Sequence, residues 1–217
     1  MTSDLNKDII RIDYNHLNLP ILVLFNNEDR IQYTYDATGI KLEKKVTVDN
    51  VNSYTYYASN YIYEKDNNGE SLQFFSHPEG YVEKDGSSFR YVYQYKDHLG
   101  NIRLSYSDLD LNGSIDPSSE ILEEKNYYPF GLEHNGYNNV INGTEHPYKY
   151  NGNELNEELG LDWYDYGARN YDPALGRWMN VDPLVEQTMD PYGYVWNNPL
   201  RFVDPDGRKG QDWVLGE

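Results

Sequence analysis

The chain has 217 residues, enough for one substantial hydrophobic core or two small ones. Its 36 acidic and 18 basic residues give a net charge of −18, which argues against binding to nucleic acid and insertion into anionic membranes. The absence of cysteine excludes disulfides and thiolate chemistry, and 23 tyrosines in a chain with 15% aromatic residues indicate a folded protein.

Short β-branched and tyrosine-rich runs alternate with Asn, Asp and Gly from Ile9 to about Arg103. This pattern is typical of antiparallel strands joined by tight hairpins, so the expected fold class is all-β with little helix. The expected strands are Leu19–Phe25, Arg30–Tyr35, Lys41–Val48, Ser53–Tyr63, Ser71–Ser76, Tyr81–Lys84 and Phe89–Tyr95. Short helical turns are expected only at Leu155–Leu159 and Leu184–Gln187.

Three segments share one order of residues: a Tyr-x-Tyr strand, an acidic turn, a glycine and a second strand. They begin at Tyr33, Tyr61 and Tyr93. Their spacing of roughly 30 residues is the size at which β-repeats stack hairpin on hairpin. A stacked or spiralling sheet is therefore favoured over a closed sandwich.

These motifs resemble a known family. Tyr35-Asp36-x-x-Gly39 is similar to the YD repeat of Rhs proteins, and Tyr95–Arg103 resembles their signature hairpin. The C-terminal half resembles the Rhs repeat-associated core domain, also found in the C subunit of insecticidal toxin complexes. The motifs that carry this second resemblance are Tyr127–Gly131, Tyr150–Gly152, Gly167–Trp178 through Asp182-Pro183, Asn197–Pro199 and Val203–Gly207.

The resemblance implies a domain organisation and a set of partners. Residues 1–90 would be YD-repeat-like strands, 91–207 the core domain, and 208–217 a tail after the Asp-Pro-x-Gly motif. In that family the repeats wind a β-sheet into a shell, the core domain plugs one end, and a toxic polypeptide follows. Upstream repeats and a C-terminal toxin domain are thus the implied partners of a secreted or cell-surface bacterial protein, whose export signal is not in this segment. Exposed sheet edges would also permit a homodimer.

Arg169 and Asp182 are the candidate catalytic residues. In the similar toxin C subunits, an Arg and an Asp at this spacing serve aspartyl-type self-cleavage behind the Asp-Pro-x-Gly motif. The cut would lie at Gly207, Arg208 or Lys209, although the family places Leu or Met where this chain has Arg208. The other interpretation is a clamp in which the arginine joins neighbouring hairpins.

An acidic loop is the candidate metal site. Residues 108–116 match the first nine positions of an EF-hand-like calcium loop, with Glu120 one place later than the usual closing carboxylate. Its candidate ligands are Asp108, Asp110, Asn112, Ser114, Asp116 and Glu120. A Ca²⁺ site and a solvated acidic hairpin without metal remain the two alternatives for this loop. No required cofactor is expected, and the five histidines lack the spacing of a zinc site.

The aspartates that precede proline, and a group of aromatic residues, have more ordinary interpretations. Asp172, Asp190 and Asp204 are expected to form turns, because Asp before Pro caps backbone N–H groups. Packing is favoured over a sugar-binding platform for the C-terminal aromatic residues. These are Trp163, Tyr164, Tyr166, Tyr171, Trp178, Tyr192, Tyr194 and Trp196.

Two functions are consistent with these patterns. The first is a structural encapsulation and plug module of an Rhs polymorphic toxin, with self-cleavage after Asp204–Gly207 releasing a C-terminal effector. Self-cleavage is the one enzymatic activity that this hypothesis includes. The second is a non-enzymatic β-rich adhesin or interaction module whose tyrosine-rich face binds carbohydrate or protein.

Overall fold

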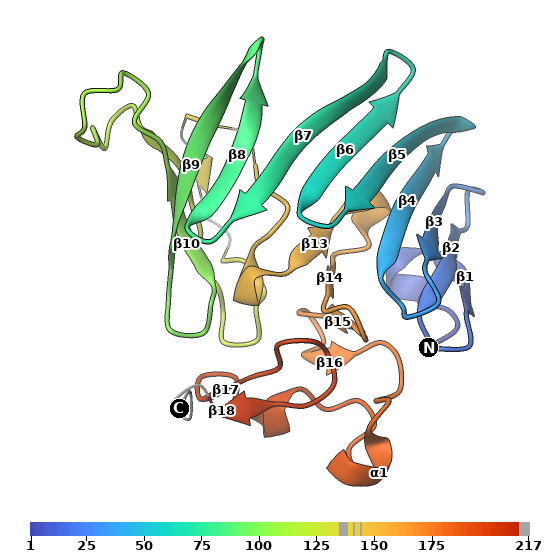
Figure 1. Cartoon of the computed structure of the whole chain (residues 1–217). Helices are drawn as coiled ribbons and strands as arrows, with labels where there is room; N and C mark the ends of the chain where they lie inside the picture. Colours follow the sequence, from blue (N-terminus) through green and yellow to red (C-terminus); the bar gives the residue numbers. More distant parts are fainter. Residues whose placement is uncertain (135–138, 141, 144, 213–217) are drawn as a thin grey trace.

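The computed structural model describes residues 1–134, 139–140, 142–143 and 145–212 (Figure 1). The predicted tail at 208–217 is therefore described only as far as Asp212, and residues 213–217 lie outside the described residues. The first part of the chain forms one antiparallel sheet of twelve strands, each paired with the next in chain order. The strands are β1 (Ile9–Tyr14), β2 (Pro20–Phe25), β3 (Arg30–Tyr35), β4 (Lys41–Val48), β5 (Val51–Ala58), β6 (Tyr61–Asp66), β7 (Gly69–His77), β8 (Gly80–Asp85), β9 (Ser88–Lys96), β10 (Ile102–Tyr106), β11 (Ile121–Glu124) and β12 (Asn139–Val140).

The C-terminal segment forms two smaller antiparallel sheets. The first contains β13 (Glu154–Asn156), β14 (Trp163–Asp165), β15 (Asn170–Asp172) and β16 (Arg177–Trp178), and the second contains β17 (Phe202–Val203) and β18 (Gln211–Asp212). Helical structure in the described residues is limited to α1 (Val185–Thr188) and 3₁₀ turns at Leu5–Lys7, Tyr150–Gly152, Glu158–Gly160 and Val195–Asn197. The all-β prediction with little helix is confirmed.

Each of the three sequence repeats is a hairpin, as its pattern predicts. The pairs are β3–β4, β6–β7 and β9–β10. The turn carboxylates accept backbone N–H bonds, with Asp36 accepting from Thr38 N (2.8 Å) and Ile40 N (3.0 Å). Asp97 does the same for the third hairpin. The acidic residue therefore fixes the turn, and the glycine beside it adopts a positive φ that other residues avoid.

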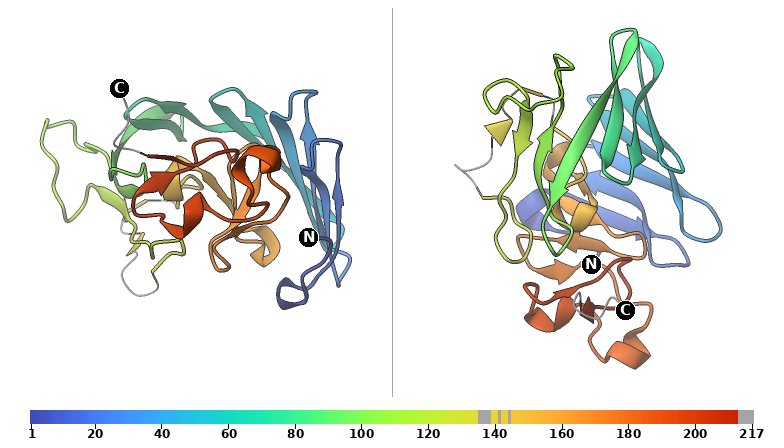
Figure 2. Two further views of the ribbon diagram at one scale, coloured as in Figure 1. Left: turned by 90° about the horizontal axis from the view of Figure 1, so that it is seen from below. Right: turned by 60° about the vertical axis from the view of Figure 1, so that its left-hand side comes forward.

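The large sheet curves around the C-terminal segment. Seen from below in Figure 2, the strands form an arc, and Figure 1 shows β13 and β14 within the span of that arc, whereas β16–β18 and α1 lie below its lower edge. One hydrophobic core joins β1–β4 to Leu161, Trp163 and Met179. A second lies against the strands from β6 to β11 and contacts Tyr148. The concave face of the sheet is thus covered mainly around β13 and β14, and the rest of the C-terminal segment continues below the sheet.

Buried charges also join the sheet to the C-terminal segment. Lys41 Nζ, on β4, lies 2.7 Å from a Glu154 carboxylate oxygen and 2.6 Å from an Asp165 carboxylate oxygen. Lys44 Nζ lies 3.0 Å from the other Glu154 oxygen, to which the Tyr57 hydroxyl donates at 2.7 Å. We call this group, formed by Lys41, Lys44, Tyr57, Glu154 and Asp165, the sheet–plug cluster.

Two local predictions were wrong. The run Ser53–Tyr63 was expected to be one strand, but it contains a turn between β5 and β6, at Ser59 (φ +60°). A continuous run of tyrosines and β-branched residues without glycine hides that turn. The helical turn expected at Leu155–Leu159 is also wrong at its start, because Leu155 lies in β13, whereas the turn expected at Leu184–Gln187 corresponds to α1.

The C-terminal aromatic residues form a core instead of a surface platform. Six of the eight that were named are at most 3% exposed: Trp163, Tyr164, Tyr166, Tyr171, Trp178 and Tyr194. Only Tyr192 (41%) and Trp196 (50%) are exposed. Packing is therefore confirmed for these six buried residues.

The predicted domain boundary at residues 90 and 91 falls inside β9, in the middle of the continuous sheet. The division into YD repeats and core domain thus stays a prediction about sequence families. Within the described part of the chain, helical segments are far shorter and more polar than a membrane crossing requires.

Candidate functional site

Arg169 lies just before β15, after the tight turn that leaves β14. The Asp165 carboxylate accepts the Gly167 N–H at 2.8 Å and fixes this turn. The side chain of Arg169 is 2% exposed, and its guanidinium lies 4.1 Å from the ring centre of Trp178. A charged group with so little access to water requires anionic or carbonyl partners nearby.

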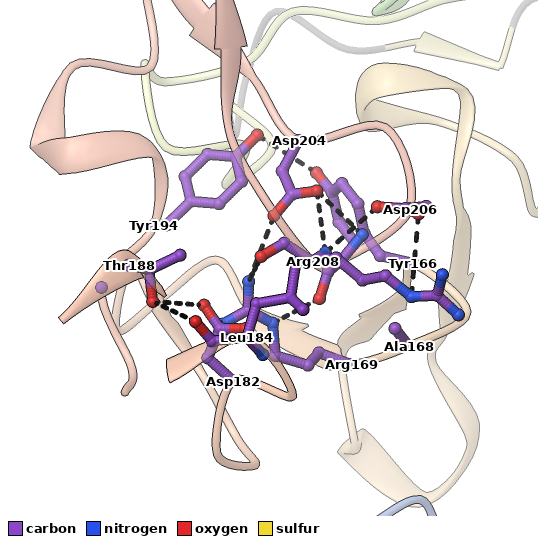
Figure 3. Close-up of polar contacts among 12 residues, drawn as sticks. Tyr166, Ala168, Arg169, Asp182, Leu184, Thr188, Tyr194, Asp204, Asp206 and Arg208 are labelled. Carbon is purple, nitrogen blue, oxygen red and sulfur yellow. Dashed lines mark hydrogen bonds and ion pairs between the residues drawn. The ribbon is translucent and has the colours of Figure 1, made fainter. Parts of the chain in front are cut away.

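Those partners are two aspartates from separate parts of the chain (Figure 3). Arg169 Nη1 lies 3.2 Å from Asp182 Oδ2, and Nη2 lies 3.2 Å from Asp204 Oδ2. Both carboxylates are buried. The predicted pair Arg169 and Asp182 is therefore brought together, and the structure adds Asp204 to it.

The same guanidinium binds the backbone just after the Asp-Pro-Asp-Gly motif. Arg169 Nε donates to the Gly207 carbonyl, and Nη2 donates to the Arg208 carbonyl at 3.2 Å. Asp204 Oδ1 accepts the N–H groups of Gly207 (2.9 Å) and Arg208 (3.0 Å). The peptide group between Gly207 and Arg208 is thus held by a cation at its oxygen and a carboxyl group at its nitrogen.

Gly207 is required at this position for two reasons. Its φ is +75°, and a Cβ there would lie 2.9 Å from Arg169 N. Of the three residues predicted to border a cut, Gly207 is buried, whereas Arg208 and Lys209 are exposed. The motif therefore places one peptide bond at the boundary between the buried cluster and solvent.

Asp182 is oriented by the short helix α1. Its Oδ1 accepts the Leu184 N–H at 2.7 Å, and its Oδ2 accepts the Thr188 hydroxyl at 2.9 Å. Although Arg169 Nη1 is close to Asp182 Oδ2, the geometry is not that of a hydrogen bond, and Nη1 has no hydrogen-bond partner among the described residues. This arginine is incompletely satisfied on the side that faces Asp182.

Burial shifts the protonation equilibria of the cluster. Burial lowers the pKa of Arg169, and the attraction of Asp182 and Asp204 only partly offsets it. Burial also raises the pKa of Asp204 above its ordinary value, against the opposing effect of Arg169. A raised carboxyl pKa beside a held peptide nitrogen is suited to proton donation.

A cavity of about 20 Å³ lies within the cluster. Arg169, Asp182, Asp204 and Arg208 are among the residues that line it. This volume admits about one water molecule. The cluster therefore combines two carboxyl groups, a cation on a carbonyl oxygen and space for a nucleophile.

Sequence reasoning assigned Asp204 only to turn formation. That assignment is confirmed by its two backbone contacts, but the side chain also reaches Arg169. Asp172 and Asp190 also form turns, since their carboxylates accept N–H groups of the residues that follow them. Asp172 Oδ2 additionally accepts the Trp163 Nε1–H at 3.3 Å and lies 3.6 Å from Lys7 Nζ. The Asp-Pro context alone could not separate Asp204 from the other two.

The acidic loop between β10 and β11 brings together three of its six predicted ligands. Oxygens of Asp108, Asp110 and Glu120 all lie within 4.8 Å of one another. Glu120 is 2% exposed and accepts the N–H groups of Leu109 (2.6 Å) and Asp116 (2.7 Å). Both the calcium site and the acidic loop without metal remain predictions.

Two of the other three predicted ligands, Asn112 and Asp116, form local hydrogen bonds. The Asn112 side chain accepts the Ser114 N–H at 2.8 Å, and Asp116 accepts the Ser118 N–H at 2.9 Å. These contacts shape the loop and turn both side chains toward the backbone.

Three further glutamates surround Lys149, which has no recognisable motif in the sequence. Lys149 Nζ lies 2.8 Å from Glu133, 2.7 Å from Glu145 and 3.1 Å from Glu157. Lys149 is 1% exposed, so these acids neutralise a buried cation. They are explained by packing without a metal.

Comparisons with known proteins give a consistent result. No protein-family model matches the chain. It is 30% identical to salivary gland surface protein 1 of Aedes aegypti over 97% of its length and 33% identical to toxin subunit YenC2 of Yersinia entomophaga over 52%. It is 29% identical to the tRNA nuclease WapA of Bacillus subtilis over 84%. The chain spans only 6%, 12% and 7% of these relatives, respectively.

Solved structures share the fold. The crystal structure of TcdB2-TccC3 matches 91% of the chain with a TM-score of 0.73 at 22% identity, over 10% of the matched chain. The Photorhabdus luminescens Tc holotoxin pore matches the same share with a TM-score of 0.72 at 23% identity. The sequence and fold similarities together relate the chain to Rhs-like, toxin-related proteins.

Proposed function

We propose that this chain is the Rhs repeat-associated core end of a toxin shell, which closes the shell and cleaves itself after Gly207. The similarity to toxin subunits and the wrapping of the sheet around the C-terminal segment support the structural role. One observation carries the cleavage role: the Gly207–Arg208 peptide group lies between the Arg169 guanidinium and the Asp204 carboxyl group. The parent protein would be secreted or on the cell surface, with the upstream repeats and a C-terminal toxin domain as partners.

The proposed reaction is hydrolysis of the Gly207–Arg208 bond. Asp182 takes a proton from a water molecule, whose oxygen attacks the Gly207 carbonyl carbon. Arg169 stabilises the negative charge that develops on the carbonyl oxygen, because its Nε already donates to that atom. The C–N bond breaks as Asp204, in its protonated form, gives a proton to the Arg208 nitrogen. The products are a carboxylate at Gly207 and an amine at Arg208.

The clamp interpretation makes a different prediction from the same contacts. If Arg169 only joins the hairpins, the chain keeps its full mass, and removing a carboxylate lowers stability without changing the mass. The raised pKa of Asp204 and the unbonded Nη1 of Arg169 favour chemistry over a clamp, because both show that the cluster is not arranged for the strongest ion pairing.

Intact mass spectrometry of the purified chain over several days tests the cleavage. Wild type should release residues 208–217, and Asp182→Asn should slow this at least about a hundredfold by removing the general base. Asp162→Asn removes an exposed carboxylate outside the cluster and should cleave at the wild-type rate. Full-length mass in all three chains would overturn the cleavage and leave the clamp.

Protection from protease tests the shell. In a longer chain with upstream YD repeats and a polypeptide attached after Glu217, the attached polypeptide should resist an added protease. Glu154→Gln, which weakens the sheet–plug cluster, should expose it. Equal digestion of the attached and the free polypeptide would contradict encapsulation.

The second candidate function rests on aromatic side chains that remain exposed on the large sheet. Phe89 (58%), Tyr91 (61%) and Tyr95 (65%) alternate along β9, and Phe75 lies 6.5 Å from Phe89 between ring centres. Such a face suits carbohydrate or protein binding. Glycan-array binding that is lost in Tyr91→Ala would support this alternative, and a silent array would remove its carbohydrate form.

A further inference from the structure

A second cavity lies beside the residue that follows the proposed cut. Its volume is about 270 Å³, and Arg208 and Asp206 form part of its wall. The rest of the wall combines the apolar side chains of Leu17, Leu19 and Ile40 from the large sheet and of Tyr166, Ala168 and Pro183 from the C-terminal segment with Thr38 and two glycines. The cavity therefore has the size and lining to hold an aliphatic side chain.

The apolar side of this cavity is built by the large sheet. Leu17 and Leu19 belong to the β1–β2 connection, and Ile40 belongs to the β3–β4 connection. The two connections touch, because a Cβ on Gly39 would lie 3.2 Å from Leu17 Cδ1 and 3.1 Å from Leu19 Cδ1. The pocket thus exists only where the sheet and the C-terminal segment are packed together.

The backbone of Arg208 is fixed at the edge of this cavity. Its N–H donates to Asp204, and its carbonyl accepts from Arg169. Figure 3 shows its side chain directed away from the Arg169 guanidinium, past Asp206 and toward Ala168. The point at which this side chain leaves the backbone is therefore set by the same contacts that hold the proposed scissile bond.

Arg208 lies beside an opposite charge and also borders the cavity. Arg208 Nε lies 3.8 Å from Asp206 Oδ2, and the two side chains are 56% and 57% exposed. An ion pair this open to water contributes little, so a preference for the residue at position 208 would come mainly from its aliphatic stem, which borders the cavity. A carboxylate at residue 208 would instead face Asp206 across the same distance.

We propose that this cavity is the specificity pocket for the side chain at position 208 and that it selects a long aliphatic stem with a neutral or cationic end. The proposal rests on the self-cleavage proposed above. It explains how a basic residue occupies the position after Gly207: the stem lies against apolar walls contributed by the sheet, and the guanidinium stays in solvent beside Asp206.

Substitution of Arg208, followed by intact mass spectrometry, tests the pocket. Arg208→Met and Arg208→Lys should be cleaved within about twofold of the wild-type rate, because both keep the stem. Arg208→Ala should be about fivefold slower. Arg208→Glu should be about tenfold slower, because its length matches Met but its charge repels Asp206. Equal rates for Met, Ala and Glu would overturn the pocket while leaving the cleavage intact.

Two matched substitutions on the large sheet, one inside and one outside the cavity wall, test whether the sheet contributes to the pocket. Leu17 lines the pocket and Ile21 does not, yet they are similarly exposed, at 37% and 39%. Leu17→Lys should slow cleavage because its ammonium group repels Arg208, and Arg208→Met should restore the rate. Ile21→Lys should have no effect. Equal effects of Leu17→Lys and Ile21→Lys would contradict the assignment of the wall.

A measurement without cleavage separates the two proposals. In the Asp182→Asn background, Arg208→Ala should lower the melting temperature by about 2–4 °C and Arg208→Met should not. If wild type keeps its full mass but this difference appears, the self-cleavage fails and the pocket still holds residue 208. If Ala and Met melt alike, the pocket fails whatever the wild-type mass shows.

Discussion

Two buried charge clusters of this protein contain the same kinds of group but differ in how well their charges are satisfied. In the sheet–plug cluster, Lys41 and Lys44 meet Glu154 with Nζ–oxygen distances of 2.7 Å and 3.0 Å. In the cluster at the chain end, Arg169 meets Asp182 and Asp204 at 3.2 Å each.

The difference appears in the protonation equilibria. Burial opposes ionisation of Glu154, but Lys41 and Lys44 outweigh it and hold its pKa at about 2. At Asp204, burial outweighs Arg169 and the pKa is raised. A buried carboxylate that contacts two lysines stays ionised and serves packing, whereas one cation shared by two acids and two carbonyl groups leaves a carboxyl group able to exchange its proton.

The largest expected loss of stability comes from removing a carboxylate of the sheet–plug cluster. Glu154→Gln leaves Lys41 and Lys44 buried with one carboxylate fewer, so the free energy of unfolding should fall by about 3–5 kcal/mol. Urea denaturation measures this, with the exposed Glu70→Gln as a control that should change little. A loss equal to that of the control would show that the cluster does not hold the sheet to the C-terminal segment.

A second prediction concerns the acid sensitivity caused by His146, which lies near Glu154 of the sheet–plug cluster. Burial lowers its pKa from 6.5 to about 4, and its ring stacks on Tyr81 at 4.0 Å between ring centres. The folded form therefore resists protonation, so stability is fully present above pH 6.5 and falls by about 3 kcal/mol as the pH drops to 4. Denaturation curves at both pH values measure this, and His146→Phe should reduce the slope. An unchanged slope would assign the acid sensitivity to other groups.

The rate of the proposed cleavage at the cluster of Arg169, Asp182 and Asp204 should depend on pH. The proposed hydrolysis needs Asp204 protonated, and its raised pKa brings that form closer to neutrality. The protonated fraction of Asp204 grows by up to tenfold for each unit of falling pH, so cleavage should be faster at pH 6 than at pH 7, by up to about tenfold. Mass spectrometry at both pH values measures the ratio. A rate that falls on acidification would contradict Asp204 as the acid.

In the acidic loop between β10 and β11, the carboxylates are held by backbone N–H groups, whereas the two buried clusters hold theirs with lysine or arginine. If Asp108, Asp110 and Glu120 bind Ca²⁺, millimolar calcium should raise the melting temperature by about 2–4 °C, and a chelator should reverse it. Asp110→Asn should remove the response, and Asp85→Asn, which removes a carboxylate of the β8–β9 hairpin that is not among the candidate ligands, should keep it. No shift in wild type would leave the loop as a solvated acidic hairpin.

Local patterns predicted much of the fold. The strands Arg30–Tyr35 and Lys41–Val48 have the observed bounds, because each is flanked by turn residues that end a strand. The turn inside Ser53–Tyr63 was missed because its residues carry no glycine or proline signal. Strand Ile9–Tyr14 was also absent from the expected set, since its charged residues break the apolar alternation.

The candidate site was predicted in part. The motif pointed to Arg169 and Asp182, which the structure brings together. It did not point to Asp204 as their partner, because an Asp before Pro has a sufficient local explanation in its own turn. The pocket beside Arg208 gave no sequence signal, since its walls come from Leu17 and Ile40 at one end of the chain and Pro183 near the other.

The sequence by itself determined the all-β class, the hairpin repeats and the motif that carries Arg169, because strand alternation and turn chemistry act over a few residues. Only the tertiary structure decided which carboxylates share the guanidinium, which tyrosines are buried and where the sheet meets residue 208. Those outcomes depend on the curvature of twelve strands around the C-terminal segment. Burial and charge compensation are set by that whole arrangement, and no local window of sequence contains it.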